Sequence, residues 1–254
     1  MKDLDMKSTF NETLTKKCLL YSGGMDSYVI SKLEDFDFLL YVDIGTKYAK
    51  EEVEFLKKQG VEVIVDSRLN LADLEMDSGI VPLRNLFFVM IAVEHGASEI
   101  VMGVTSGDRI HDKDLKFASL AEDVINHQLQ QTWWHPGTEV NINFKYKKYS
   151  KGQLIEKYIN AGHDPEDLLN KSFSCYEPLE NGDPCLECKS CIRKQASLSK
   201  YIDITPRAIE KLKVFYTTSK IDEIKTFRGT KMDRGDEDTE ILEAYANGFK
   251  KQNG

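Results

Sequence analysis

The sequence predicts an α/β fold with a doubly wound, mainly parallel five-stranded sheet, followed by a helical subdomain rich in cysteine. Three observations support this prediction. Short apolar runs alternate with segments of helical periodicity, a Ser-Gly-Gly turn joins the first run to the first helix, and four of the five cysteines lie between residues 175 and 191. A chain of 254 residues is long enough for one large domain with a small appendage.

The predicted strands are of two kinds. Four are mostly apolar, as strands buried on both faces of a parallel sheet are; they are Lys17–Tyr21, Phe38–Asp43, Val61–Asp66 and Glu99–Val104. In the fifth, Val140–Tyr146, apolar and polar residues alternate, which predicts a half-exposed strand at an edge of the sheet.

Segments with helical periodicity accompany these strands, at about Lys47–Gln59, Asn85–Gly96, Asp114–Gln131 and Ser150–Ala161. Such alternation predicts parallel strands joined by right-handed crossovers. In sheets of this kind, ligands bind at the carboxyl ends of the strands. The loop after the first strand therefore lies where a ligand is expected.

That loop is Ser22-Gly23-Gly24-Met25-Asp26-Ser27. Apolar residues recur at helical spacing from Met25 to Leu33, so the glycines precede a helix N-terminus, which offers free backbone N–H groups and the positive end of the helix dipole to an anion. The two glycines let the backbone approach a phosphate closely, and the serines and the aspartate add hydroxyl donors and a carboxylate. The pattern matches neither a Walker loop nor a dinucleotide-binding loop.

The pattern Ser-Gly-Gly-x-Asp-Ser resembles the PP-loop of the ATP pyrophosphatases. These enzymes cleave ATP between the α and β phosphates, hold the pyrophosphate in this loop and adenylate a substrate oxygen. The resemblance implies an adenine nucleotide alpha hydrolase-like, Rossmann-like fold and binding of ATP with Mg²⁺. We expect the ATP-binding residues to be Ser22, Gly23, Gly24, Met25, Asp26, Ser27 and Asp43.

The cysteine cluster has the spacing Cys-x9-Cys-x2-Cys-x2-Cys, formed by Cys175, Cys185, Cys188 and Cys191. Two residues between thiolates let a tight turn direct both sulfurs at one ion, and four thiolates complete a closed tetrahedral zinc shell. The cysteine triplet is also similar to part of an iron–sulfur run, but the spacing to Cys175 does not fit the usual ferredoxin patterns. The spacing therefore favours one structural Zn²⁺ per chain.

The composition limits the class of protein. The net charge of −8 argues against a protein that holds nucleic acid through its overall field. No stretch approaches the ~18 apolar residues of a membrane span, and the polar segment Met1–Asn11 has no signal-peptide core. We therefore expect a cytoplasmic protein without a membrane partner and without stable nucleic-acid binding.

Further motifs, read in order from about residue 16 to residue 200, resemble those of the 7-cyano-7-deazaguanine synthase family of the queuosine pathway. They are Val81-Pro82-Leu83-Arg84-Asn85, Gly103-Val104 followed by Asp108, Ser150-Lys151, and Ser174-Cys175-Tyr176. The resemblance implies an ATP-dependent carbon–nitrogen ligase that acts on ammonia and a 7-deazaguanine acid, and a homodimer. It also implies a carboxylate converted to a nitrile through an adenylated carboxylate and an amide.

Within that resemblance, Asp26, Ser27, Arg84 and Lys151 are the expected catalytic residues, with Arg84 and Lys151 as cations for the ATP phosphates or the substrate carboxylate. The expected substrate-binding residues are Arg84, Asn85, Asp108 and Asp114. The two aspartates would accept hydrogen bonds from the amidine edge of the base. We expect a nucleotide-binding domain over residues 1–165, a zinc-binding helical subdomain over 166–204, and a charged C-terminal helix and tail over 205–254.

The sequence departs from the family after Asp108. The family carries an aromatic-Ser-Gly-Tyr-Pro-Asp-Cys-Arg segment there, whereas this chain has Arg109 to Lys116. Asp114 matches the family's Asp and Lys116 its Arg, but the Tyr, Pro and Cys are absent. Lysine does not replace the planar fork of arginine. This change leaves open an amide-forming ligase that stops at 7-amido-7-deazaguanine; a tRNA-modifying PP-loop enzyme and a silent nucleotide-binding scaffold are further alternatives.

Two segments carry weaker signals. The loop Thr132–Thr138 contains two tryptophans, which we expect to pack against the domain, although a lid or an oligomer contact is possible. From about Asp203 onward the chain is charged and weakly periodic. Ala208–Tyr216 is a candidate helix, and Lys225–Thr239 is expected to be a mobile, solvated segment.

Overall fold

A computed structural model describes residues 10–77, 79–180 and 183–252. Within these residues, no helix is both long enough and apolar enough to cross a membrane. Contacts between residues divide the chain into two compact units. We call the first the sheet unit (Met1–Ser22, Glu34–Val104 and Ile110–Lys145) and the second the helical unit (Gly23–Leu33, Thr105–Arg109 and Tyr146–Gly254).

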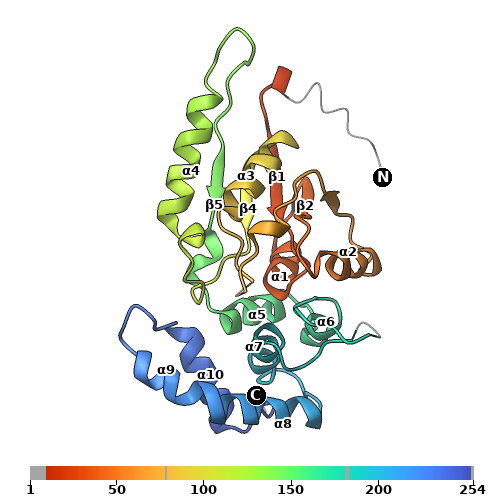
Figure 1. The fold of residues 1–254 in the computed structure, drawn as a ribbon, viewed down its shortest axis with the longest axis vertical. Helices are drawn as coiled ribbons and strands as arrows, with labels where there is room; N and C mark the ends of the chain where they lie inside the picture. Colours follow the sequence, from red (N-terminus) through yellow and green to blue (C-terminus); the bar gives the residue numbers. More distant parts are fainter. Residues whose placement is uncertain (1–9, 78, 181–182, 253–254) are drawn as a thin grey trace. The chain divides into compact units, whose positions relative to one another are not determined.

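The sheet unit is built on five strands in the order β3-β2-β1-β4-β5 (Figure 1). All four pairings between neighbouring strands are parallel, from β2 with β3 through to β4 with β5. The strands are β1 (Lys16–Leu20), β2 (Phe38–Val42), β3 (Ile64–Asp66), β4 (Ala97–Met102) and β5 (Asn141–Asn143). β1 is the central strand; β2 and β3 follow on one side of it, and β4 and β5 then follow on the other side. The predicted doubly wound α/β class is therefore confirmed.

Two strands differ in length from the sequence prediction. The strand expected over Val61–Asp66 is formed only as β3, and the one expected over Val140–Tyr146 only as β5. Both are edge strands with a neighbour on one side, as β5 was predicted to be. After β5 the chain turns into a 3-10 helix at Lys145–Lys148.

Apolar side chains from the strands and two helices form the core of the sheet unit. These helices are α3 (Arg84–Glu94) and α4 (Leu115–Gln128), and α2 (Ala49–Lys58) also belongs to the sheet unit. Val89 and Ala92 of α3 and Ile100 of β4 have no measurable exposure. All three helices lie within a few residues of the bounds predicted from periodicity, which an amphipathic helix shows clearly.

The helical unit contains most of the remaining helices. They are α1 (Met25–Leu33), α5 (Lys151–Asn160), α6 (Pro165–Asn170), α7 (Lys189–Leu198), α8 (Pro206–Phe215), α9 (Ile221–Phe227) and α10 (Asp236–Ala246). The boundaries predicted from the sequence, at 165/166 and 204/205, do not coincide with those of the two units, and the predicted three-part division stays a prediction.

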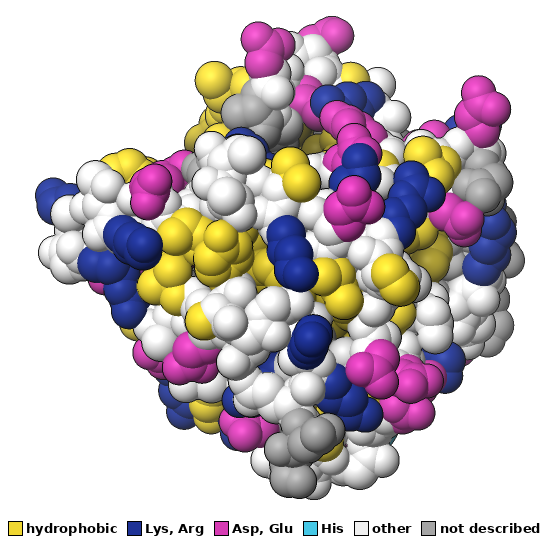
Figure 2. All heavy atoms as spheres, turned by 90° about the horizontal axis from the view of Figure 1, so that it is seen from below, with side chains coloured by type: hydrophobic (Ala, Val, Ile, Leu, Met, Phe, Trp, Pro, Cys, Tyr) yellow, Lys and Arg dark blue, Asp and Glu magenta, His cyan; other side chains and the backbone are white. Residues whose placement is uncertain are grey.

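The C-terminal part of the helical unit corrects one expectation. The segment Lys225–Thr239, predicted to be mobile and solvated, instead contains the end of α9 and the start of α10. Glu237 and Asp238 are buried there, with 1% and 4% exposure. Most other residues of the segment are exposed, so the expectation of a solvated segment fails only at these two residues. It fails there because these acidic side chains have distant basic partners, which local charge patterning does not reveal. On the face drawn in Figure 2, basic and acidic side chains are interspersed around hydrophobic patches.

The loop Thr132–Thr138 corrects a second expectation. Trp133 is 97% exposed and Trp134 is 45% exposed, so Trp133 does not pack against the domain. The buried aromatic side chain of this loop is that of His135, which lies beside the Phe10 ring with 6.2 Å between ring centroids. Its Nδ1 also accepts a hydrogen bond from the Gly137 N–H.

Candidate functional site

The topology of the sheet fixes where the candidate site begins. β1 and β4 are neighbours, and between them the order of the strands reverses, so their carboxyl ends form the topological switch point where ligands bind in such sheets. The chain passes from the sheet unit into the helical unit directly after these two ends, at Ser22/Gly23 and at Val104/Thr105. Most of the predicted PP-loop and Asp108 therefore belong to the helical unit.

The loop that follows β1 leads directly into α1, as the sequence predicted. Ser27 is 4% exposed, and its hydroxyl donates a hydrogen bond to the Gly24 carbonyl at 3.1 Å. The Gly24 carbonyl also accepts from the Tyr28 N–H at 2.9 Å. The Phe173 N–H donates to the Gly23 carbonyl at 2.8 Å, which joins the loop to the segment just before the cysteine cluster.

Asp26 and Lys151 are brought together within the helical unit. The Lys151 ammonium donates to Asp26 Oδ2, and both side chains are largely buried. Lys151 is the first residue of α5, whose N-cap is Ser150. The other Asp26 oxygen, Oδ1, is buried and has no hydrogen-bond partner among the described residues. A carboxylate and an ammonium at the start of two helices suit a phosphate with its metal counter-ion.

Asp108 lies in the short segment of the helical unit that follows β4. Its Oδ2 accepts a hydrogen bond from the Thr105 N–H at 2.9 Å. The Lys147 ammonium donates to the backbone carbonyls of Thr105 and Asp108, at 3.2 and 2.6 Å. These bonds hold the Asp108 turn in one conformation, and a role of Asp108 in substrate binding stays a prediction.

Arg193 of α7 is a residue near this site that the sequence reading missed. Its Nε donates to Glu237 Oε1 at 3.0 Å, and its Nη2 donates to the same oxygen. Burial alone would lower the pKa of Arg193, but Glu237, with further contributions from Asp108 and Asp26, raises it above its ordinary value. Arg193 therefore stays charged and lies within electrostatic reach of the Asp26 and Asp108 carboxylates.

Glu237 of α10 is the second residue missed. Oε1 also accepts from Arg234 Nη1 at 3.0 Å, whereas Oε2 is buried without a hydrogen-bond partner among the described residues. A Cβ atom placed on Gly107 would lie 1.7 Å from Oε2, so a side chain there would collide with this carboxylate. Arg193 and Glu237 are 44 residues apart in sequence, and no local pattern marks their pairing.

Arg84 and Asn85 belong to the sheet unit, at the start of α3. The Arg84 guanidinium lies 5.9 Å from the centroid of the Phe88 ring, and its Nε is buried without a hydrogen-bond partner among the described residues. Asn85 is 4% exposed and donates from Nδ2 to the Asp112 carbonyl at 3.2 Å. Asn85 thus supports the turn in which the chain departs from the family pattern.

Asp114, also in the sheet unit, is the N-cap of α4. Its Oδ1 accepts from the Phe117 N–H at 2.8 Å, and its Oδ2 lies 3.4 Å from Nδ1 of the exposed His111. The hydrogen bond from Phe117, with His111 nearby, lowers the pKa of Asp114. This carboxylate has a capping role, and its predicted contact with substrate is untested.

Asp43 follows β2 and borders an open hollow of about 540 Å³ in the sheet unit. Its Oδ1 accepts from the Gly45 N–H at 2.8 Å, which forms a tight turn. Thr46, which precedes α2, and Lys50, in its first turn, lie on the wall of the same hollow. The hollow provides space beside Asp43, and ATP binding by Asp43 stays a prediction.

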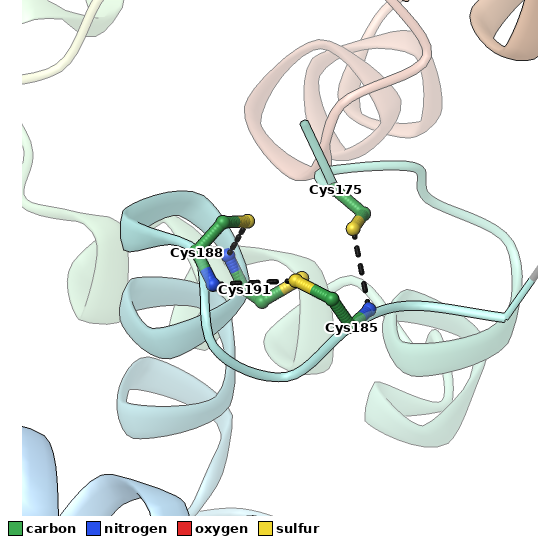
Figure 3. Close-up of side chains that lie close together, drawn as sticks. All are labelled: Cys175, Cys185, Cys188 and Cys191. Atoms are coloured by element: carbon green, nitrogen blue, oxygen red, sulfur yellow. Dashed lines mark hydrogen bonds between the residues drawn. The ribbon is translucent and has the colours of Figure 1, made fainter. Parts of the chain in front are cut away.

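The four predicted metal ligands converge in the helical unit (Figure 3). The sulfur atoms of Cys175, Cys185, Cys188 and Cys191 all lie within 4.8 Å of one another. Cys175 and Cys191 are buried.

Backbone amides surround these sulfurs. The Cys185 N–H donates to Cys175 Sγ at 3.3 Å, the Cys188 N–H to Cys185 Sγ at 3.2 Å, and the Cys191 N–H to Cys188 Sγ at 3.5 Å. Such N–H···S bonds favour the thiolate form that a metal requires. The set fits a closed tetrahedral zinc site, which would hold the segment before α7 against that helix and leave no ligand position for catalysis.

Comparisons with known proteins identify the family. A sequence model of the family described as "Queuosine biosynthesis protein QueC" matches residues 40–202, more than half of the chain. The match begins after the Ser22–Ser27 loop and ends before α8. No solved structure matches the chain significantly.

Curated relatives agree with the family model. Three proteins named 7-cyano-7-deazaguanine synthase are similar to the chain, from Rickettsia conorii (strain ATCC VR-613 / Malish 7), Rickettsia massiliae (strain Mtu5) and Geobacter sp. (strain M21), with 24%, 28% and 27% identity. The alignments cover 73%, 73% and 69% of this chain and 94%, 94% and 89% of the relatives. Together with the match to the family model, the order of the motifs and the fold that carries them show that this chain belongs to the QueC family of queuosine biosynthesis proteins.

Proposed function

We propose that this protein is an ATP-dependent carbon–nitrogen ligase that converts 7-carboxy-7-deazaguanine and ammonia to 7-cyano-7-deazaguanine. The observation that carries the proposal is the pairing of Asp26, in the Ser-Gly-Gly-x-Asp-Ser loop, with Lys151 at the start of α5. Membership of the QueC family and the names of the relatives support the choice of substrate. A cytoplasmic location stays a prediction from the composition, and a homodimer stays a prediction of the family resemblance.

The first half of the reaction activates the acid. A substrate carboxylate oxygen attacks the α phosphorus of ATP, the bond to the β-phosphate oxygen breaks, and pyrophosphate leaves. Ammonia then attacks the acyl carbon and displaces AMP, which gives the amide. A carboxylate resists attack by an amine until its oxygen is part of a good leaving group, so the free energy of ATP hydrolysis is needed at this step.

The second half repeats the activation on the amide. The amide oxygen attacks the α phosphorus of a second ATP and pyrophosphate leaves. Loss of AMP and of both protons from the nitrogen then gives the nitrile. The loop backbone from Ser22 to Ser27 would bind the departing pyrophosphate, and Lys151 would neutralise part of its charge. Asp26 would orient Lys151 and hold Mg²⁺, which would supply further charge neutralisation to the leaving group. We assign Arg84, on sequence resemblance alone, to an anionic group of the substrates.

The altered segment Arg109 to Lys116 favours one second candidate, a ligase that stops at the amide. Asp114, the residue that matches the family's base-contacting aspartate, is engaged as the N-cap of α4, and His111 beside it is fully exposed. An enzyme that lacked productive contacts to the amide intermediate would release it before the second activation.

One experiment tests both candidates. Purified protein is incubated with ATP, ammonium and 7-carboxy-7-deazaguanine, and the purine product and AMP are quantified by mass spectrometry. The nitrile route gives two AMP per product, whereas the amide route gives one AMP and a product heavier by one water. Absence of either product, with AMP formation no greater than in the Asp26→Asn variant, would contradict the proposed function.

A further inference from the structure

Lys151 owes its position to the first turn of α5. Ser150 and Gln153 form a capping box in which the Gln153 N–H donates to Ser150 Oγ at 3.1 Å and the Ser150 N–H donates to Gln153 Oε1 at 3.0 Å. A capping box fixes the backbone at the helix start. The direction in which the Lys151 side chain leaves the helix therefore depends on this turn.

A carboxylate from α10 binds the residues on both sides of Lys151. The Ser150 hydroxyl donates to Glu240 Oε1, and the Gly152 N–H donates to Glu240 Oε2 at 3.1 Å. One residue further on, Gln153 Nε2 donates to Asp236 Oδ2 at 3.1 Å. The Glu240 carboxylate thus accepts a hydrogen bond from a backbone N–H group that has no partner within the helix, and its charge complements the positive end of the helix dipole.

The close approach of Glu240 depends on a glycine next to Lys151. A Cβ atom at Gly152 would lie 2.6 Å from the Glu240 carboxylate carbon. Tyr201 makes a further contact with this turn: its hydroxyl donates to the Gly152 carbonyl at 3.2 Å. Glu240 lies 90 residues after Ser150 in the chain, and α10 lies wholly beyond the residues that match the QueC family model.

We propose that Glu240 is a positioning residue for the phosphate site: it fixes the first turn of α5 and thereby directs the Lys151 ammonium toward Asp26 and the pyrophosphate of ATP. This inference rests on the proposed function. It assigns to a segment outside the family match a part in binding the leaving group. Glu240 acts through Lys151 and not by touching substrate itself.

The test is a double-mutant cycle on pyrophosphate binding, measured by isothermal titration calorimetry with Mg²⁺ present. The variants of the full-length chain are Glu240→Ala, Lys151→Met and the double variant. Glu243→Gln is the matched control, because Glu243 is an exposed acidic residue on the same helix. We expect Glu240→Ala to weaken pyrophosphate binding about tenfold. The reason is that a displaced Lys151 would lose one hydrogen bond to the charged pyrophosphate. In the Lys151→Met background, Glu240→Ala should weaken pyrophosphate binding almost no further, because the effects of two residues that act through each other are not additive.

Glu240→Gln provides a second variant if Glu240→Ala unfolds. It keeps the length of the side chain and one acceptor oxygen, so it should weaken binding less than Glu240→Ala, with an unchanged thermal midpoint. Equal losses in both backgrounds would overturn the inference, since Glu240 would then act independently of Lys151. Tighter binding by Glu240→Ala would also overturn it, because α10 would then compete with the anion. If wild-type protein failed to bind pyrophosphate, the proposed function itself would fail; if wild type binds and Glu240→Ala binds equally well, only the inference fails.

Discussion

The sheet unit and the helical unit differ in how many charged side chains they bury. In the sheet unit, one continuous cluster of apolar residues surrounds the strands. That unit buries the charged residue Asp66 as well, but in the helical unit the buried set includes three charged residues, Lys194, Glu237 and Asp238. Apolar packing is non-directional, so other apolar side chains can partly replace a lost one. A buried charge instead requires its own partner, and its loss leaves the other charge uncompensated. We therefore expect the helical unit to depend more strongly on single side chains.

Removal of the metal should give the largest difference in stability between the two units. A structural zinc in a thiolate shell contributes about 10–16 kcal/mol to folding. Chelation, or Cys188→Ser, should therefore make the segment 175–198 sensitive to protease while the sheet unit stays protected. Mass spectrometry of the fragments, together with metal analysis of anaerobically purified protein, checks this. Cys18→Ala is the control, because Cys18 is buried in β1, outside the cluster. Iron with acid-labile sulfide, or unchanged metal content in Cys188→Ser, would exclude the zinc site.

Loss of the Glu237 carboxylate should give the next largest effect. Glu237→Ala leaves Arg193 and Arg234 without their shared acceptor. We expect the free energy of unfolding of the helical unit to fall by about 3–5 kcal/mol, the usual cost of breaking a buried ion pair. Urea unfolding followed by hydrogen exchange in α7 and α10 measures it. Glu243→Ala, on the exposed side of the same helix, should change the stability by less than about 0.5 kcal/mol. Equal effects of the two substitutions would mean that Glu237 is not buried against the arginines.

In the sheet unit, Glu52 should give stability a dependence on pH. Burial raises the pKa of Glu52 to about 7, although the hydrogen bond from the Tyr41 hydroxyl, at 2.5 Å, and the charge of Arg84 oppose the shift. Because the pKa is higher in the folded than in the unfolded state, the folded state binds the proton more tightly. Stability should therefore fall by about 3 kcal/mol as the pH rises from about 4.5 to about 7, and change little above.

Thermal unfolding of wild type and Glu52→Gln across this pH range tests the prediction. The variant should lack this decrease and should be more stable than wild type above pH 7, since a neutral amide avoids the cost of a buried charge. Parallel curves for the two proteins would show that Glu52 titrates as an ordinary surface carboxylate.

The smallest effect should come from the N-cap Asp114. Asp114→Ala should destabilise the sheet unit by about 1 kcal/mol, and Asp114→Ser should restore most of this, because serine also caps helices well. If Asp114 in addition binds the deazaguanine, both variants should raise the KM for that substrate while the KM for ATP stays unchanged. A normal KM in Asp114→Ser would restrict the residue to its capping role.

The two units also differ in how far the sequence predicts them. The strands around Leu19 and Ile100 and the helix of Val89 were predicted because their apolar periodicity is local. The convergence of the cysteines was predicted for a similar reason, since Cys185, Cys188 and Cys191 lie close together in the sequence.

The acidic turn of α10 was not predicted, because its partners are remote. Glu237 bonds Arg193 across 44 residues, and Glu240 bonds Ser150 across 90 residues. In the sequence, Asp236, Glu237 and Asp238 look like any solvated acidic run. Burial of such residues depends on tertiary partners, which periodicity and local charge patterning cannot identify.

We expect the loop from Ser22 to Ser27, with Asp26 and Lys151, to direct ATP cleavage to the bond between the α and β phosphates. The most direct test is to quantify all nucleotide and phosphate products after incubation with ATP, ammonium and the deazaguanine acid. We predict AMP and pyrophosphate in equal amounts, and a large loss of both in Asp26→Asn with the fold retained. ADP and inorganic phosphate as the stoichiometric products would contradict it.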